Sequence, residues 1–216
     1  MGDILRSVDM QFSVTIPQIF YDLIARMVPG YLFLLMLSYE LSGTGVNILS
    51  INKLSSNSLL IVLFVLSYGV MSYVMGWVLR SLSFLSAEKK VKKVSESDLE
   101  FKKITVPISE MYQKIRIKDE AVGFRILKLR AEARMLESSR TGMFYISCIA
   151  VTLILLNILD LLPRYNNSVL EWIVKIVIPV ILTLAFWRRE HHAWENYYGN
   201  IFSHYKILFT TSERLT

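Results

Sequence analysis

Apolar residues along this chain are gathered into four long runs separated by polar segments. The runs are Val28–Leu41, Leu59–Leu79, Met143–Leu162 and Val169–Trp187. A bilayer core about 30 Å thick is crossed by roughly 20 apolar residues, because an α-helix rises about 1.5 Å per residue. The last three runs have that length almost without charge. The pattern therefore predicts an all-α integral membrane protein with four transmembrane helices arranged as two hairpins.

The first run, residues 28–41, is shorter and covers only about 21 Å as a helix. It follows Ile16–Met27, an amphipathic segment whose apolar residues recur at helical spacing. We expect Pro29 and Gly30 to break or kink the chain there, because proline lacks the amide donor, and Pro179 to act as a hinge in the fourth span. The first run is expected to cross by borrowing length from a neighbouring segment. A re-entrant segment is the alternative.

Positive charge is concentrated between the second and third runs. The segment Arg80–Arg140 carries the whole formal net charge of the chain, +6, while the links Ser42–Ser58 and Pro163–Ser168 carry almost none. Short loops rich in Lys and Arg stay in the cytoplasm, so the basic segment is expected there. Four crossings then leave both termini in the cytoplasm.

The chain is thus predicted to have five parts. They are an amphipathic N-terminal helix (1–27), a first transmembrane hairpin (28–80), a basic helical cytoplasmic region (81–141), a second transmembrane hairpin (142–187) and an amphipathic cytoplasmic tail (188–216).

The cytoplasmic region is predicted to contain one long helix that begins at Ser109. No helix breaker occurs between Arg125 and Ile146, so this helix is expected to run straight into the third span. Its apolar residues repeat every seven positions, a period typical of a narrow stripe that packs against another helix. The stripe consists of Ile108, Ile115, Val122, Leu129 and Leu136.

The second span carries a stripe of small or hydroxylated residues, Tyr68, Ser72 and Gly76, at four-residue steps. One interpretation is a packing seam, because small residues let helix backbones approach in lipid. The other is a polar path, since a hydroxylated face is better placed toward protein or water than toward acyl chains. Under that interpretation these three residues line a pore.

Carboxylates also fall near the outer ends of the spans. Glu40, Asp160 and Glu171 would form a ring that favours cations at the outer mouth of an oligomeric pore. The alternative is local pairing, of Glu171 with Lys175 four residues later and of Asp160 with Arg164.

No catalytic motif is present. The cluster of Glu190, His191, His192 and Glu195, with His204 downstream, is the only group with metal-ligand character, and it lacks the His-Glu-x-x-His order and a second cluster. We expect no enzyme activity, no metal and no cofactor.

The basic region can interact with anionic lipid, nucleotide or nucleic acid, or it can serve only to set the topology. Four cations of the long helix are the candidates to meet an anionic regulator. They are Arg125, Lys128, Arg130 and Arg134.

Two segments carry a resemblance to a known family. The succession Ile24-Ala25-Arg26-Met27-Val28-Pro29-Gly30-Tyr31-Leu32-Phe33 and the insert Ala131-Glu132-Ala133-Arg134-Met135-Leu136, with the four-span layout, resemble small bacterial membrane proteins of anti-phage islands, the Hailong-type effectors. The resemblance implies a homo-oligomeric ion channel in antiviral defence. It also implies control by an oligonucleotide that a partner nucleotidyltransferase makes.

Two functions follow from these patterns. The first is an oligomeric gated ion channel or pore-forming effector, regulated through its basic cytoplasmic helices. The second is a non-conducting membrane anchor or scaffold whose inner helices recruit a soluble partner. In both, the chain contacts the lipid bilayer; a homo-oligomer is expected because one chain of four spans is too small to enclose water.

Overall fold

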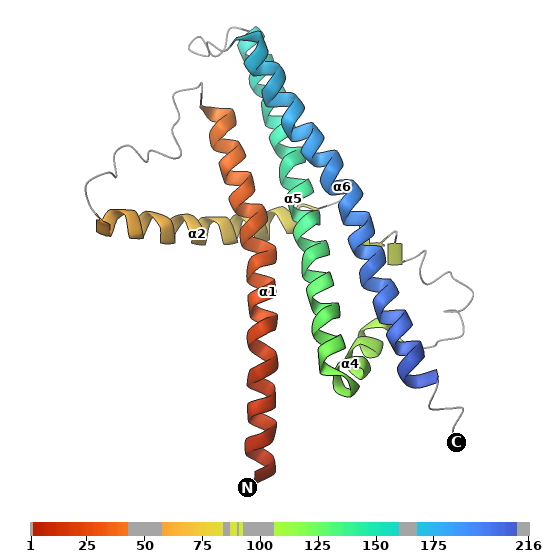
Figure 1. Cartoon of the computed structure of the whole chain (residues 1–216). Coiled ribbons are helices and arrows are strands. Elements are labelled where there is room, and N and C mark those ends of the chain that lie inside the picture. Colours follow the sequence, from red (N-terminus) through yellow and green to blue (C-terminus); the bar gives the residue numbers. More distant parts are fainter. Residues whose placement is uncertain are drawn as a thin grey trace. The chain divides into compact units, whose positions relative to one another are not determined.

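The computed structural model of the chain is helical in all its described elements (Figure 1). The structure describes residues 2–42, 58–83, 87–89, 91–92, 106–159 and 168–210, with only the backbone for residues 2–18, 58–60, 169 and 210. The elements are α1 (Gly2–Leu41), α2 (Ser58–Ser81), α4 (Ile108–Lys118), α5 (Glu120–Ile158), α6 (Val169–Tyr205) and a π-helical turn, η2 (Lys206–Thr210).

Four helices are long and apolar enough to cross a membrane, as judged by length and composition. Their membrane-length segments are Ile19–Leu41, Ile61–Ser81, Glu120–Ile158 and Leu170–Phe209, the last of which continues from α6 into η2. The prediction of an all-helical chain with four such helices is therefore confirmed. The two-hairpin arrangement and the orientation in the membrane stay predictions.

The first apolar run is part of one uninterrupted helix, α1. Its apolar segment begins at Ile19, so the run does gain length from the residues before it. The expected break at Pro29-Gly30 is wrong, because α1 continues through both residues, whereas a kink or hinge there stays a prediction. Both are buried, and Gly30 packs tightly against α2. A proline is tolerated inside a membrane helix when neighbouring helices stabilise that part of the backbone.

The long cytoplasmic helix is divided in two. Helix α4 begins at Ile108, one residue from the predicted start, and ends at Lys118, after which Asp119 is extended (φ −143°, ψ 99°). The Asp119 carboxylate accepts a hydrogen bond from the amide of Val122 at 3.1 Å, so it caps the start of α5. The prediction of one helix from Ser109 is wrong at this position. The uninterrupted stretch into the third apolar run is confirmed by α5.

The chain divides into two compact units. One, here the apolar unit, consists of Arg26–Phe84 and Met135–Arg188 and holds all four apolar runs; the other, here the charged unit, consists of Met1–Ala25, Leu85–Arg134 and Arg189–Thr216. Helices α1, α5 and α6 each contribute residues to both units.

The core of the apolar unit joins all four of its helices. Buried side chains of α1, α2 and α5 form it, and side chains of α6 pack against it. Within this unit α2 runs across α1 in Figure 1 instead of alongside it. Many apolar side chains of α2 are exposed, as expected of a surface that meets lipid or another chain. The core residues are Phe33, Leu34, Met36, Leu79, Met143 and Ile146, with Leu182 and Phe186 of α6 against them.

The charged unit buries the apolar face of the tail. Trp194, Tyr197 and Tyr198 of α6 contact one another through their rings, with centroids 5.0 to 6.0 Å apart. All three are buried, as are Ile201 and Phe202 one turn later. The amphipathic tail predicted from the sequence therefore packs inside a helical unit.

Candidate functional site

Helices α1 and α2 meet at a contact without room for added atoms. A Cβ on Gly30 would lie 1.7 Å from the carbonyl oxygen of Ser72, and a Cβ on Gly76 would lie 1.8 Å from the carbonyl oxygen of Arg26. The absence of a side chain at each glycine thus lets the backbone of the other helix approach closely. Next to this contact, the Arg26 guanidinium donates a hydrogen bond to the Tyr73 hydroxyl at 2.8 Å. Small residues and a charge-assisted hydrogen bond together hold the crossing.

The three pore-lining candidates all lie at this crossing. Ser72 and Gly76 are buried in the α1–α2 contact, and the Tyr68 ring packs edge-on against Tyr31 of α1 at 5.3 Å. This is the arrangement that the packing-seam interpretation expects. A pore-lining role for the three residues stays a prediction.

Two charged side chains are buried in the apolar unit where α1 ends and α6 begins. Glu40 is 0% exposed and Lys175 is 3% exposed. The Lys175 ammonium donates a hydrogen bond to the backbone carbonyl of Glu40 at 3.0 Å and lies 5.5 Å from the centroid of the Tyr39 ring. The carboxylates of Glu40 and Glu171 both attract the ammonium. Ionisable residues inside membrane segments are rare and commonly mark functional sites.

The outer-mouth candidates have different surroundings. Glu40 is buried beside Lys175, whereas Glu171 is exposed in the first turn of α6. The Glu171 carboxylate accepts a hydrogen bond from the Ser168 amide at 2.9 Å, and the Ser168 hydroxyl accepts one from the Glu171 amide at 3.3 Å. This reciprocal pair is a capping box. Asp160 and its suggested partner Arg164 lie outside the described residues.

A buried polar stretch in the middle of α5 was not predicted from the sequence. Five consecutive residues, Glu137–Thr141, are all buried although all are polar or charged. The Ser83 hydroxyl, just after α2, donates a hydrogen bond to the Glu137 carboxylate at 2.9 Å. One signal was present in the sequence: hydroxyl residues and Gly142 directly precede an apolar run, which is typical of close helix packing.

Replacing Ser83 with alanine tests this contact. The change leaves a buried carboxylate without one of its donors, which costs about 1.5–3 kcal/mol for a hydrogen bond to a charged group. We expect the thermal unfolding temperature in detergent to fall. Ser81→Ala is the matched control, because the exposed Ser81 hydroxyl donates a hydrogen bond to the Val78 carbonyl of its own helix. Equal unfolding temperatures for the two variants would contradict a stabilising role for the Ser83–Glu137 bond.

The four cationic candidates do not form one surface. Arg125 and Lys128 are exposed on α5, whereas Arg130 and Arg134 are half-buried. Arg134 lies 3.7 Å from the Asp22 carboxylate of α1.

Arg130 lies close enough to Tyr112 of α4 to act on its phenol. Burial raises the pKa of the Tyr112 phenol above its ordinary value, and Arg116 and Arg130 oppose that rise. Arg130 and Arg134 therefore interact with groups of this chain. Arg125 and Lys128 remain open to solution.

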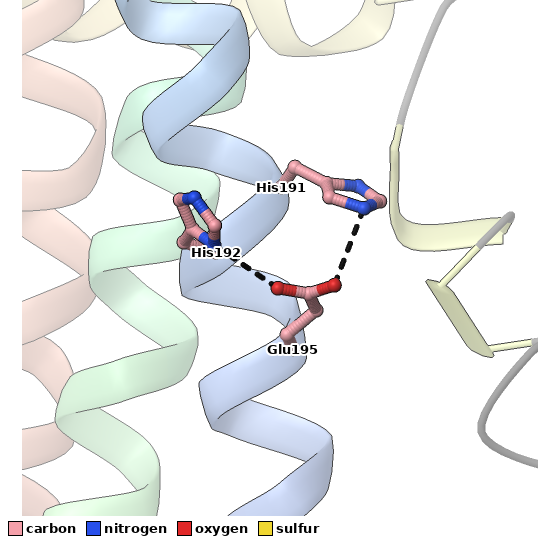
Figure 2. A network of polar contacts seen from close by, with 3 residues as sticks. All are labelled: His191, His192 and Glu195. Carbon is pink, nitrogen blue, oxygen red and sulfur yellow. Dashed lines mark hydrogen bonds and ion pairs between the residues drawn. The ribbon is translucent and has the colours of Figure 1, made fainter.

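The histidine cluster of α6 forms a small polar network. Figure 2 shows the Glu195 carboxylate between both imidazoles: one oxygen lies 3.3 Å from His191 Nε2 and the other lies 3.1 Å from His192 Nδ1. All three side chains are at least partly exposed. Across the described residues, no group of three or more His, Cys, Asp or Glu side chains has a metal-binding arrangement.

Comparisons with known proteins leave the chain to be interpreted from its own residues. No protein-family model, no curated protein and no solved structure matches it.

Proposed function

We propose that the chain is one subunit of a homo-oligomeric, gated ion channel or pore-forming effector of the bacterial inner membrane. The apolar unit forms the membrane part, and the charged unit lies in the cytoplasm and controls it. The buried pair of Glu40 and Lys175 is the observation that carries this proposal.

A plain membrane anchor has no need of buried charges in its spans. Removing a charge from water costs several kcal/mol even after relaxation of its surroundings. Helices that only hold a protein at the membrane avoid this cost by being apolar throughout. Charges retained inside a membrane protein commonly belong to ion pathways or to elements that switch between two states. Glu40 and Lys175 therefore favour conduction or gating over the anchor alternative.

Contacts inside the charged unit support a topology with both termini on one side. The N-terminal segment contacts the middle segment through Asp22 and Arg134 at 3.7 Å. The middle segment contacts the tail, because the Lys118 ammonium donates a hydrogen bond to the Leu208 carbonyl at 2.6 Å. Segments in such contact cannot lie on opposite sides of a bilayer. These contacts support an even number of crossings, and the basic composition favours the cytoplasmic side.

Labelling a single cysteine tests this topology. Lys128→Cys in a Cys148→Ser background introduces one thiol at an exposed position of α5. We expect a membrane-impermeant maleimide to label it only after the inner membrane is opened. Labelling in intact spheroplasts would overturn the proposed orientation.

Regulation is proposed to act through the cations that face solution. Arg125 and Lys128 are open to an anionic regulator, whereas Arg130 and Arg134 stabilise the unit internally. That the regulator is an oligonucleotide, made by a partner nucleotidyltransferase in anti-phage defence, rests on the resemblance of the sequence alone.

Ion flux through liposomes tests the channel directly. Purified protein is reconstituted into vesicles with a potassium gradient, and a voltage-sensitive dye records the membrane potential. We expect the wild type to dissipate the gradient and Gly69→Ala to do the same, because a Cβ there meets only the end of Met27 at 3.7 Å. If vesicles with folded protein hold their gradient while the protein captures a soluble partner, the anchor alternative is correct.

A further inference from the structure

The Lys175 ammonium lies among groups that bind small cations. The carbonyl oxygen of Glu40 is 3.0 Å away, the Tyr39 ring faces it at 5.5 Å, and the carboxylates of Glu40 and Glu171 attract it. Both carboxylate oxygens of Glu40 are buried, and so is almost the whole lysine side chain. Water is thus largely excluded from this cluster.

The backbone at the end of α1 makes the electrostatic potential around the Lys175 ammonium negative, even without the side chains. Glu40 precedes the last residue of α1, so its carbonyl belongs to the last turn, where the carbonyls lie at the exposed end of the helix backbone. The aligned peptide dipoles add roughly half a negative charge at this terminus. Carbonyl oxygens, a carboxylate and an aromatic face are the groups with which membrane proteins hold monovalent cations.

We propose that the end of α1, formed by the Glu40 carbonyl and carboxylate and the Tyr39 ring, is a site for a small monovalent cation such as Na⁺ or K⁺. The Lys175 ammonium fills this site in the structure as a cation tethered to α6. We expect a monovalent ion, because a divalent ion in an oxygen cage takes six or more oxygen ligands. The inference concerns binding, and it holds whether or not the chain conducts.

Removing the tethered charge should therefore make the protein depend on dissolved cations. To test this, the thermal unfolding temperature of Lys175→Met in detergent is measured separately in choline chloride, sodium chloride and potassium chloride at equal ionic strength. Choline is too large for a site that an ammonium group fills. We expect the unfolding temperature of the variant to rise by about 3–6 °C in sodium or potassium, once the cation exceeds its dissociation constant tenfold. The wild type should unfold at one temperature in all three salts.

Two further variants separate a cation site from a general salt effect. Glu40→Gln combined with Lys175→Met removes the carboxylate and should abolish the cation dependence. Lys175→Arg keeps a tethered positive charge and should show none. The same unfolding temperature for Lys175→Met in choline and in both inorganic salts overturns the proposal.

A second neutral variant covers the case in which methionine prevents folding. Lys175→Gln keeps an amide donor for the Glu40 carbonyl and is tested in the same salts. Recovery of folded protein only in sodium or potassium supports the site. If neither neutral variant folds in any of the three salts, an inorganic cation cannot replace the ammonium and the proposal is wrong. Because the readout is unfolding and not ion flux, this result is separate from the test of the channel.

Discussion

Gly30→Ala and Gly76→Ala are each expected to destabilise the protein by about 3 kcal/mol or more, the upper part of the range for overpacked sites. The added Cβ would lie within 1.8 Å of a carbonyl oxygen of the facing helix in both variants. The obstructing atoms belong to the backbone, so no side chain can rotate away. The two helices must separate, and the unfolding temperature in detergent should fall by about 6–12 °C.

Two glycines elsewhere in the chain provide matched controls. A Cβ on Gly69, also in α2, meets only the flexible end of Met27 at 3.7 Å, and a Cβ on Gly199 in α6 meets nothing within 4 Å. Alanine at these positions should leave the unfolding temperature unchanged or raise it slightly, because alanine favours the helix by up to about 1 kcal/mol over glycine. If Gly30→Ala or Gly76→Ala unfolds at the same temperature as Gly69→Ala, the α1–α2 contact described here is wrong.

This contact changes how pore mutants of α2 must be interpreted. Leucine at Ser72 or Gly76 would test a pore-lining role by blocking conductance. Because Ser72 is buried and a Cβ on Gly76 would meet the backbone of α1, we expect both changes to force α1 and α2 apart. A loss of ion flux in such variants would therefore indicate a pore only if the unfolding temperature were unchanged.

The second large effect is expected at the buried charges. In choline chloride, Glu40→Gln and Lys175→Met should each cost about 3–5 kcal/mol, because each leaves one buried charge without its main partner. The double variant should cost clearly less than the sum of the two, by an interaction energy of about 0.5–3 kcal/mol. Thermal unfolding of the four proteins of this double-mutant cycle measures that energy.

Glu171→Gln distinguishes the two possible carboxylate partners of Lys175. Glutamine retains the capping box with Ser168 while it removes the negative charge. Because Glu171 is exposed, we expect this variant to unfold close to the wild type. A larger loss of stability in Glu171→Gln than in Glu40→Gln would show that the local pair, four residues apart on α6, is the stronger interaction.

Much of the secondary structure followed from local patterns. The runs of apolar residues predicted four membrane-length helices, and the shortness of the first run indicated that its helix extends beyond it. The structure places this extension before the run and not after it. Predictions that depend on a single residue were less successful. Pro29 does not end α1, because buried contacts with α2 stabilise the helix around it, whereas Asp119 ends α4 because its carboxylate caps the next helix.

The candidate site was only partly visible in the sequence. Glu40 and Lys175 were both noted, but Lys175 was matched with Glu171 because those two lie one helical turn apart. Its hydrogen bond is instead to the carbonyl of Glu40, which lies in another helix. The buried stretch Glu137–Thr141 was not predicted, since it falls at the end of the predicted basic cytoplasmic region (81–141).

The sequence by itself determined that the chain forms long helices and which of them suit a membrane. Each helix satisfies its backbone hydrogen bonds internally, so length and apolar composition decide its formation locally. Only the tertiary structure decided that Gly30 faces Ser72, that Gly76 faces Arg26, and that the Lys175 ammonium rests on the end of α1. These contacts join residues far apart in the chain, and they depend on how the helices cross, which no pattern within one helix records.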